Sequence, residues 1–205
     1  MKASRIRWGI LVLVYLVFHF WYGGNGNALT SSEVTRYVEL AEGLGPKAAE
    51  SFKDFAQSDD GREFVMVNLN LYRDFPVYQD GRITGESSEK VEAKYTSQML
   101  RELLLRGSHP LVSVVPIQNF PGEGEVTRTL WDRATMIRYR SRRDFLDIAL
   151  NTDFHENVQH KWAALEKTHT LPSTPLIWGV GVRLIPFLAL LCLGLILDRL
   201  LDRKK

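Results

Sequence analysis

Residues 63–73 show the clearest alternation of apolar and polar side chains in the chain. One alternating set is aliphatic and consists of Val65, Val67, Leu69 and Leu71. The other set consists of Met66, Asn68, Asn70 and Tyr72. Successive side chains of a β-strand point to opposite faces of its sheet, so this segment predicts a strand with two unlike faces. We expect helices to cover the aliphatic face, which leaves the amide and phenol face open to a ligand or a partner.

The neighbouring segments predict a small α+β domain around this strand. Thr30 and Glu33 have the spacing of a capping box, which predicts the start of a lead-in helix. The other predicted elements are a second lead-in helix from residue 46, a helix over 87–106, strands over 109–120 and 131–140, a helical region from 142 and a short extended segment over 168–175. From residue 63 on, this order is the ferredoxin-like (βαββαβ) pattern, in which both helices cover one face of an antiparallel sheet. Face-to-face dimerisation would hide the other face.

The N-terminal end predicts a membrane anchor. Residues 1–7 carry three basic side chains and no acidic one, and residues 8–22 carry no charge. At ~1.5 Å per residue, a helix over 6–22 would be roughly 25 Å long, slightly short of the ~30 Å hydrocarbon core. A signal peptide cleaved near 26–28 is the alternative. We favour an uncleaved anchor because the bulky aromatic side chains within 18–22 suit a membrane interface.

The C-terminal end predicts a second span. Residues 176–197 would form a helix of about 33 Å, and a basic tail follows them. In each span, the basic residues lie at the end nearest the chain terminus. This distribution predicts that both termini lie in the cytoplasm, at the inner membrane, and that the intervening domain is extracytoplasmic. The predicted organisation is an anchor and linker over 1–27, lead-in helices over 28–62, the α+β domain over 63–174, and the second span with its tail over 175–205.

Two polar side chains fall within or close to the predicted membrane spans. Arg183 lies inside the second span, and His19 lies near the outer end of the first. Arg183 could extend its guanidinium to the outer interface, as long basic side chains do near helix ends. The alternative is a polar contact with a partner helix, for example through His19.

Charge and cysteine content narrow the function classes. The net charge is +2, but residues 28–174 carry 18 basic and 22 acidic side chains, so the basic excess lies at the two ends. The absence of a basic stripe outside the ends argues against a nucleic-acid partner. Cys192 is the only cysteine, which excludes an intrachain disulfide and a thiolate metal cluster.

Several segments follow one another in a familiar order. They are VMVNLNLYRD at 65–74, TGE at 84–86, WD at 131–132, YRSRRDFL at 139–146 and HKWAALEKT at 160–168. Together they resemble an uncharacterised family of dimeric α/β-barrel proteins in the ferredoxin-like superfamily. The resemblance implies a homodimer and brings no assigned reaction, while distant members of the superfamily include cofactor-free oxygenases and haem-binding enzymes. Arg140 and Asn70 depart from the family pattern, and the two spans are foreign to its usual soluble form.

The open sheet face is the first candidate site. If alternate residues of the strand over 131–140 face the helices, then Arg138 and Arg140 share the open face with Asn68, Asn70 and Tyr72. Two guanidinium groups beside amides and a phenol could hold a carboxylate or another oxygen-rich ligand. The alternative is a polar dimer interface.

His160 is the second candidate, as a general base or a haem ligand. On a helical wheel it points away from Phe154, Val158 and Trp162, which predicts a solvent-exposed position. No recognised metal-ligand, phosphate-loop or nucleophile motif occurs, so no cofactor is evident, and haem is a minor alternative.

These observations predict a membrane-anchored extracytoplasmic α/β-barrel module that binds a small ligand or docks on a protein in a membrane complex. The alternative function is a small cofactor-independent oxygenase or haem-handling enzyme that uses the barrel interior. The two hypotheses therefore differ in whether the chain has catalytic activity.

Overall fold

The computed structural model describes residues 2–118, 131–177 and 181–202 of the chain. The chain divides into two compact units. Met1–Asn25 and Pro175–Lys205 form the first, which we call the terminal unit, and Gly26–Thr174 form the second, which we call the central domain. The lead-in helices therefore belong to the same compact unit as the sheet.

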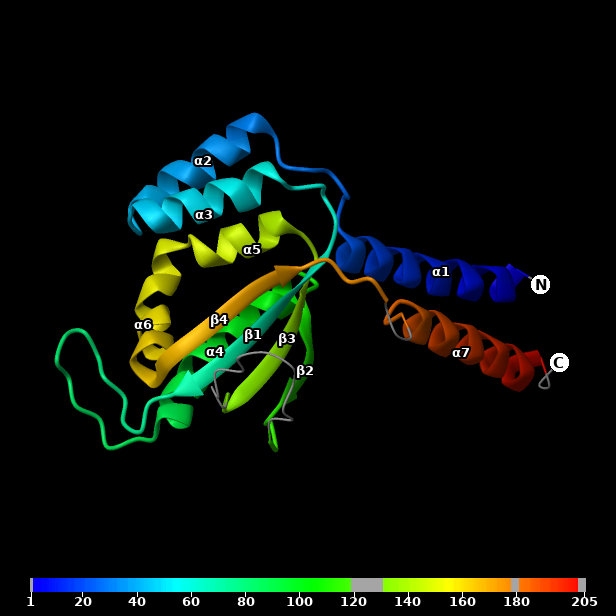
Figure 1. The fold of residues 1–205 in the computed structure, drawn as a ribbon. Coiled ribbons are helices and arrows are strands. Elements are labelled where there is room, and N and C mark those ends of the chain that lie inside the picture. The colour runs from blue at the N-terminus through cyan, green and yellow to red at the C-terminus, as the bar shows by residue number, and fades with distance from the viewer. Residues whose placement is uncertain (1, 119–130, 178–180, 203–205) are drawn as a thin grey trace. The chain divides into compact units, whose positions relative to one another are not determined.

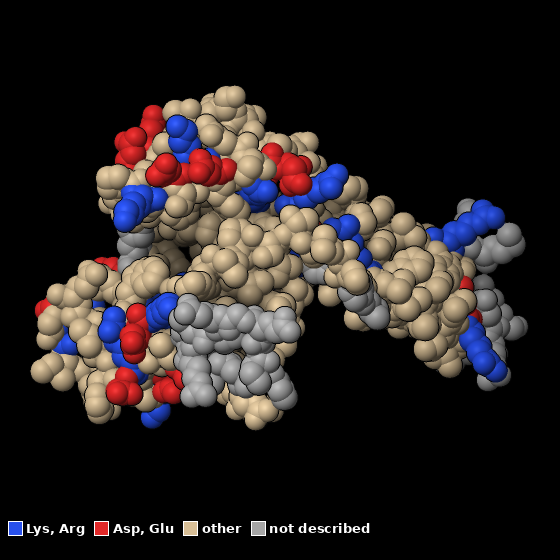
Figure 2. Space-filling model, viewed as in Figure 1, with Lys and Arg blue, Asp and Glu red and all other residues tan. Residues whose placement is uncertain are grey.

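The terminal unit is built on two helices, α1 (Lys2–Gly23) and α7 (Leu184–Asp202), at the two ends of the chain (Figure 1). Within them, Ser4–Gly23 and Leu184–Leu201 are long and apolar enough to cross a membrane, judged by length and composition alone. The visible sides of both helices are mostly uncharged (Figure 2). The two apolar helices predicted at the ends of the chain are therefore present.

The second apolar helix starts later than predicted. Its first residue is Leu184 rather than residue 176, so Arg183 lies in the turn before the helix and not inside it. Pro186 occupies the first turn of α7, where the missing N–H of proline costs no helical hydrogen bond. At ~1.5 Å per residue, α7 is still about 28 Å long, close to the thickness of a hydrocarbon core.

Asp198 joins α7 to α1. Its carboxylate accepts hydrogen bonds from Ser4 Oγ at 3.0 Å and Trp8 Nε1 at 2.7 Å, and it forms an ion pair with Arg7. Gly194 lies so close to the Trp8 ring that a Cβ atom there would be 2.6 Å from Trp8 Cη2. The two helices thus pack closely at this point, with Asp198 paired to Arg7.

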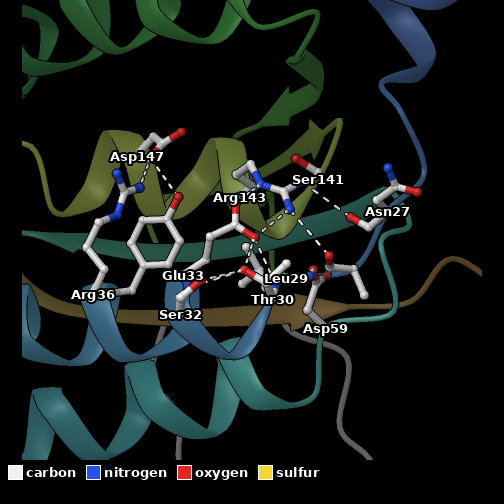
Figure 3. A network of polar contacts seen from close by, with 12 residues as sticks. Asn27, Leu29, Thr30, Ser32, Glu33, Arg36, Asp59, Ser141, Arg143 and Asp147 are labelled. Carbon is white, nitrogen blue, oxygen red and sulfur yellow. Dashed lines mark hydrogen bonds and ion pairs between the residues drawn. The ribbon is translucent and has the colours of Figure 1, made fainter.

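The central domain begins with α2 (Ser31–Glu42) and α3 (Pro46–Gln57), which pack on α5 (Arg142–Ala149) around Tyr37, Ala41, Ala56, Leu146 and Leu150. The predicted capping box is confirmed, because Glu33 N donates to Thr30 Oγ1 and Thr30 N donates to Glu33 Oε2. Arg143 extends from α5 to Glu33 and donates to both of its carboxylate oxygens, at 2.8 and 3.1 Å (Figure 3). Helix α2 is therefore linked to α5 by a bidentate ion pair between Glu33 and Arg143.

A four-stranded sheet forms the centre of the domain. Its strands are β1 (Phe64–Tyr72), β2 (His109–Val114), β3 (Arg133–Tyr139) and β4 (Leu165–Ser173), in the order β2-β3-β1-β4, and all neighbours are antiparallel. Helix α4 (Ser88–Leu105) connects β1 to β2, while α5, the short η1 (Thr152–Phe154) and α6 (His155–Ala164) connect β3 to β4. The last strand begins at Leu165, three residues before the extended segment predicted over 168–175, and β4 pairs along most of β1.

The helices cover the opposite face of β1 from the one predicted. Phe64 and Met66 pack with Tyr139, with Leu103 of α4 and with Ile148 of α5, and in Figure 1 α4 lies behind the sheet. The Phe64 and Tyr139 rings stack with centroids 5.2 Å apart. Asn68, Asn70 and Tyr72 share this face by alternation, and the aliphatic set faces away. The bulky Phe64, Met66 and Tyr139 side chains fill the volume beneath the helices.

Candidate functional site

The sheet face away from α4, which we call the open face, carries apolar rows that run across all four strands. In the first row, Met136 pairs with Val112 and Val67, and Val67 also pairs with Leu171. Paired residues of antiparallel strands lie on the same face. Val112, Met136 and Leu171 leave 43, 42 and 48% of their surfaces exposed. This row is therefore an exposed apolar surface without a charged side chain.

A second row runs beside the first. Ala134 pairs with Val114 and Leu69, and Leu69 pairs with His169 on the edge strand β4. The His169 ring lies 5.2 Å from the Trp131 ring, centroid to centroid. In Figure 2, charged side chains gather over α2 and α3 and at the opposite end of the domain, while much of the described surface between them is uncharged.

The helix-covered face carries a buried polar cluster centred on Glu92 of α4. Asn70 Nδ2 donates to Glu92 Oε1 at 3.1 Å, Arg133 Nη1 donates to Glu92 Oε2 at 2.9 Å, and the Tyr72 hydroxyl also donates to Oε2. Thr168 Oγ1 donates to Asn70 Oδ1 at 2.7 Å, so three strands and one helix contribute. Glu92 is 3% exposed, and a buried carboxylate of this kind needs these donors.

The electrostatics of this cluster keep Tyr72 protonated. Burial and the hydrogen bond to Glu92 raise the pKa of the Tyr72 hydroxyl above its usual value. The Arg133 guanidinium lies 5.1 Å from the centre of the Tyr72 ring, and about a third of the Arg133 side chain, 32%, is exposed. Through Arg133 the buried Glu92 group therefore reaches the surface.

Lys161 extends the polar region from the sheet to α6. Its Nζ lies 5.6 Å from the centre of the Tyr95 ring and 5.1 Å from that of the Trp162 ring. Burial lowers the pKa of Lys161, and the negative charge of Glu92 opposes this shift. A partly buried ammonium between two aromatic rings is a group that can attract an anion.

The predicted convergence of two arginines with the amides is wrong. Arg138 pairs with Val65 in the sheet and so lies on the other face from Asn68, Asn70 and Tyr72. Its guanidinium is 1% exposed, forms an ion pair with Glu63 and donates from Nη1 to Gly107 O at 2.6 Å. These contacts give Arg138 a structural role at the end of the sheet.

Arg140 follows the last residue of β3, and its guanidinium binds Asp144 of the next helix, α5. Its Nε and Nη2 donate to Asp144 Oδ2 and Oδ1 at 2.8 and 2.6 Å. Asp144 is in the first turn of α5, where a carboxylate is also favoured by the helix dipole. Arg140 is thus held away from the amides. Asn68, the remaining predicted member, accepts a hydrogen bond from Thr170 Oγ1 at 3.4 Å.

His160 is half-buried, which corrects the predicted solvent-exposed position. Its Nδ1 lies 2.7 Å from the Tyr78 hydroxyl. The Arg82 guanidinium lies over the Tyr78 ring, 4.2 Å from its centre, and donates to Gln159 Oε1 at 2.7 Å. The segment between β1 and α4 thus folds back onto α6, because Tyr78 and Arg82 both belong to it. Burial and the charges of Lys94 and Arg82 lower the pKa of His160.

His19 and Arg183 both have aromatic neighbours in the terminal unit. The Arg183 guanidinium lies 5.6 Å from the centre of the Tyr22 ring and close to Gly23. The His19 ring lies 5.8 Å from Tyr15 and 5.7 Å from Phe20, and its Nδ1 is buried without a hydrogen-bond partner among the described residues.

Glu92 and Lys161 were missed in the sequence because single charged residues in amphipathic helices are usually solvated. The available signal was position, since Glu92 is adjacent to Val91 and one turn before Tyr95 on the predicted inner side of its helix. Among the residues that the structure describes, no three His, Cys, Asp or Glu side chains come together as a metal site.

Comparison with known proteins gives structural neighbours only. No protein-family model matches the sequence, and no curated protein matches it. The crystal structure of the methylated RPA0582 protein is similar, with 24% identity and a TM-score of 0.55 over 63% of this chain and 93% of that chain. A second structure, of RPA0582 as a protein of unknown function from Rhodopseudomonas palustris, has 21% identity and a TM-score of 0.53 over 63% of this chain and 94% of that one. At this identity the likeness shows the fold alone.

Proposed function

We propose that this chain is a membrane-tethered module whose central domain self-associates through the open face. The observation that carries the proposal is the exposed apolar row formed by Val112, Met136, Val67 and Leu171 across all four strands. Contiguous apolar surface of this kind is characteristic of interaction sites rather than of free protein surface.

The topology supports face-to-face pairing. The strand order β2-β3-β1-β4, with one helical connection after β1 and another after β3, agrees with a ferredoxin-like arrangement. In such an arrangement the helices of both connections cover the same face of the sheet, so two copies can bring their uncovered faces together. The product of that pairing is the dimeric α/β barrel that the sequence resemblance implies.

The chemistry of the open face favours a second copy over an unrelated partner. The first row, which contains Met136 and Leu171, carries no charged side chain, and in the second row only His169 can become charged. A two-fold symmetric interface places the same patch on both subunits, so an uncharged apolar patch complements itself without needing an opposite charge.

The two apolar helices support a membrane tether. A basic N-terminal start and a basic C-terminal tail favour the arrangement in which both termini are cytoplasmic and the domain is extracytoplasmic at the inner membrane. Confinement of the domain to a membrane surface raises its effective concentration, which allows an interface of modest area to form a dimer.

The test is the oligomeric state of the full-length protein in detergent and in nanodiscs. Leu171→Glu places a charge in the apolar row, and we expect it to weaken dimerisation at least ~10-fold, measured by light scattering over a concentration series. Leu104→Glu on α4 is the matched control, because Leu104 and Leu171 have the same exposed fraction, 48%. A wild-type monomer at all concentrations, or equal dimerisation of both variants, would contradict the proposal.

A further inference from the structure

The contact between α4 and α6 contains two buried polar atoms without partners. Ser88 is 2% exposed and Asn157 is 4% exposed. Ser88 Oγ and Asn157 Oδ1 have no hydrogen-bond partner among the described residues, although Asn157 Nδ2 donates to Tyr95 O at 3.2 Å. Ser88 lies seven residues before Tyr95, about 10 Å along the helix, so the two atoms are at different levels of the contact. Buried polar atoms of folded proteins are almost always hydrogen-bonded, so the Asn157 oxygen indicates a further group beside it.

Helical spacing brings these atoms toward the polar cluster. Ser88 lies four residues before Glu92 on α4, and Asn157 lies four residues before Lys161 on α6. Residues four apart share one helix face. The Asn157 amide bonds to the α4 backbone at Tyr95, so the α6 face that carries Asn157 and Lys161 is turned toward α4. We call Ser88, Glu92, Asn157 and Lys161 the α4–α6 seam.

Of the two charged side chains in the seam, Glu92 has an ion-pair partner and Lys161 has none among the described residues. Glu92 is neutralised by Arg133, with 2.9 Å between Glu92 Oε2 and Arg133 Nη1. Lys161 is within the electrostatic influence of Glu92, but no carboxylate of the described residues forms an ion pair with its ammonium, which contacts the Tyr95 and Trp162 rings instead. The Glu89 carboxylate also acts on Arg133, so Arg133 has more than one anion near it, and the Lys161 ammonium is the cation that lacks an ion pair among the described residues. A cation in a partly buried place is stabilised by a neighbouring anion.

We propose that the α4–α6 seam binds a small organic monocarboxylate that also carries a hydroxyl group. The carboxylate binds the Lys161 ammonium and supplies its counter-charge. The ligand hydroxyl donates to Asn157 Oδ1, which lies one turn before Lys161 on the same helix and lacks a partner among the described residues. Tyr95 and Trp162 offer rings against which the apolar part of the ligand packs, and Trp162, which is 50% exposed, places the entrance at the surface. This site lies on the helix side of the sheet and does not depend on dimerisation through the open face.

The test uses three named probes on the full-length protein in detergent. They are lactate, 4-hydroxybenzoate and the uncharged 4-hydroxybenzamide. We expect saturable binding of at least one of the two carboxylates, followed by calorimetry and by Trp fluorescence, and at least ~10-fold weaker binding of the amide, because the amide cannot form the charge-assisted contact. Saturable binding of neither carboxylate, or equal binding of 4-hydroxybenzoate and its amide, would overturn the proposal.

Variants locate the site. Lys161→Met is expected to weaken binding of the carboxylate at least ~10-fold, and Lys161→Arg to retain most of it, because the charge is kept. Lys167→Met, at a lysine of β4 that lies outside the seam, is the control and should bind as the wild type does. If Lys161→Met fails to fold, mass spectrometry of lysine acetylation in the wild type replaces it, and the bound carboxylate should protect Lys161 but not Lys167. Unchanged binding by a folded Lys161→Met, or no selective protection, would overturn the assignment.

Discussion

Asn70 and Glu92 are joined by a 3.1 Å hydrogen bond between β1 and α4. The amide is thereby directed toward the helix layer and away from the open face. With Tyr72 and Arg133 also donating to Glu92, one buried carboxylate links a helix to two strands. The pair therefore holds the amide of β1 on the helix-covered face of the sheet.

Removal of this carboxylate should destabilise the domain. Glu92→Leu leaves Asn70, Tyr72 and Arg133 without their shared acceptor, and a lost bond to a buried charged group costs ~1–3 kcal/mol or more. We expect a loss of about 2–4 kcal/mol in the free energy of unfolding, measured by urea titration. Glu89→Leu, in the first turn of the same helix, is the control and should change the stability by less than ~1 kcal/mol. Equal effects of both variants would show that the buried network contributes no net stability.

Element order was predictable from the sequence, but the inward face of the sheet was not. The alternation over 63–73 correctly predicted β1, and period two gives two faces without saying which is covered. Phe64 is in register with the amide-bearing set and stacks on Tyr139 of β3, and these two rings supply much of the bulk that packs beneath the helices. The volume of Phe64, which extends the amide-bearing set, is the signal in the sequence for the covered face.

The site predicted on the open face does not form, because the amides lie on the helix-covered face and Arg138 does not. Arg138 could not meet Asn68 once the register paired Asn68 with Thr135, because alternate residues of β3 point to opposite faces. Arg140 is instead held by Asp144, four residues on, a contact that depends on where the strand ends and α5 begins. Both outcomes depend on a register that a single sequence does not specify.

Acid should weaken the tie between α2 and α5. The hydrogen bonds from Arg143, and then those from Thr30, lower the pKa of Glu33 from 4.5 to about 2. Because the folded pKa is depressed, the stabilisation is fully present above about pH 4.5 and is lost as the pH falls toward 2. We expect Glu33→Gln to remove this part of the pH dependence, measured as the difference in unfolding free energy between pH 5 and pH 2.5. Identical pH profiles for wild type and variant would contradict the assigned role of Glu33.

His160 should give a second pH dependence, in a higher range. Its folded pKa lies below the ordinary value of 6.5, so the unfolded chain binds a proton that the folded chain does not. The stabilisation is therefore present above about pH 6.5 and declines below it. His160→Gln should flatten the unfolding free energy between pH 7.5 and pH 5.5. Nuclear magnetic resonance titration of the His160 ring provides the direct check, and a folded pKa above 6.5 would reverse the sign.

Alanine substitutions at Gly61 and Gly81 should distinguish the effect of backbone strain from that of close packing. Gly61 and Gly81 have φ angles of +74° and +76°, in a region that side chains disfavour, so alanine at either position carries a strain of roughly 1 kcal/mol. A Cβ atom at Gly61 would also collide with the segment at Gly26 and lie 2.7 Å from Ala28 N, whereas a Cβ atom at Gly81 meets no atom within 4 Å. We therefore expect Gly61→Ala to destabilise the domain by about 1–3 kcal/mol more than Gly81→Ala.

The segment that Gly61 contacts is the start of the central domain, so the same substitution should loosen it. Leu29 N donates to Asp59 Oδ2 at 2.8 Å, and Arg143 donates to Asn27 O and Ala28 O at 3.3 Å, so several contacts bind residues 27–29 to the domain (Figure 3). Displacement by a new methyl group would strain all of them together. Hydrogen exchange followed by mass spectrometry should show faster exchange at residues 27–30 in Gly61→Ala and wild-type exchange there in Gly81→Ala. Similar exchange in the two variants would mean that left-handed strain, and not the close approach, makes Gly61 necessary.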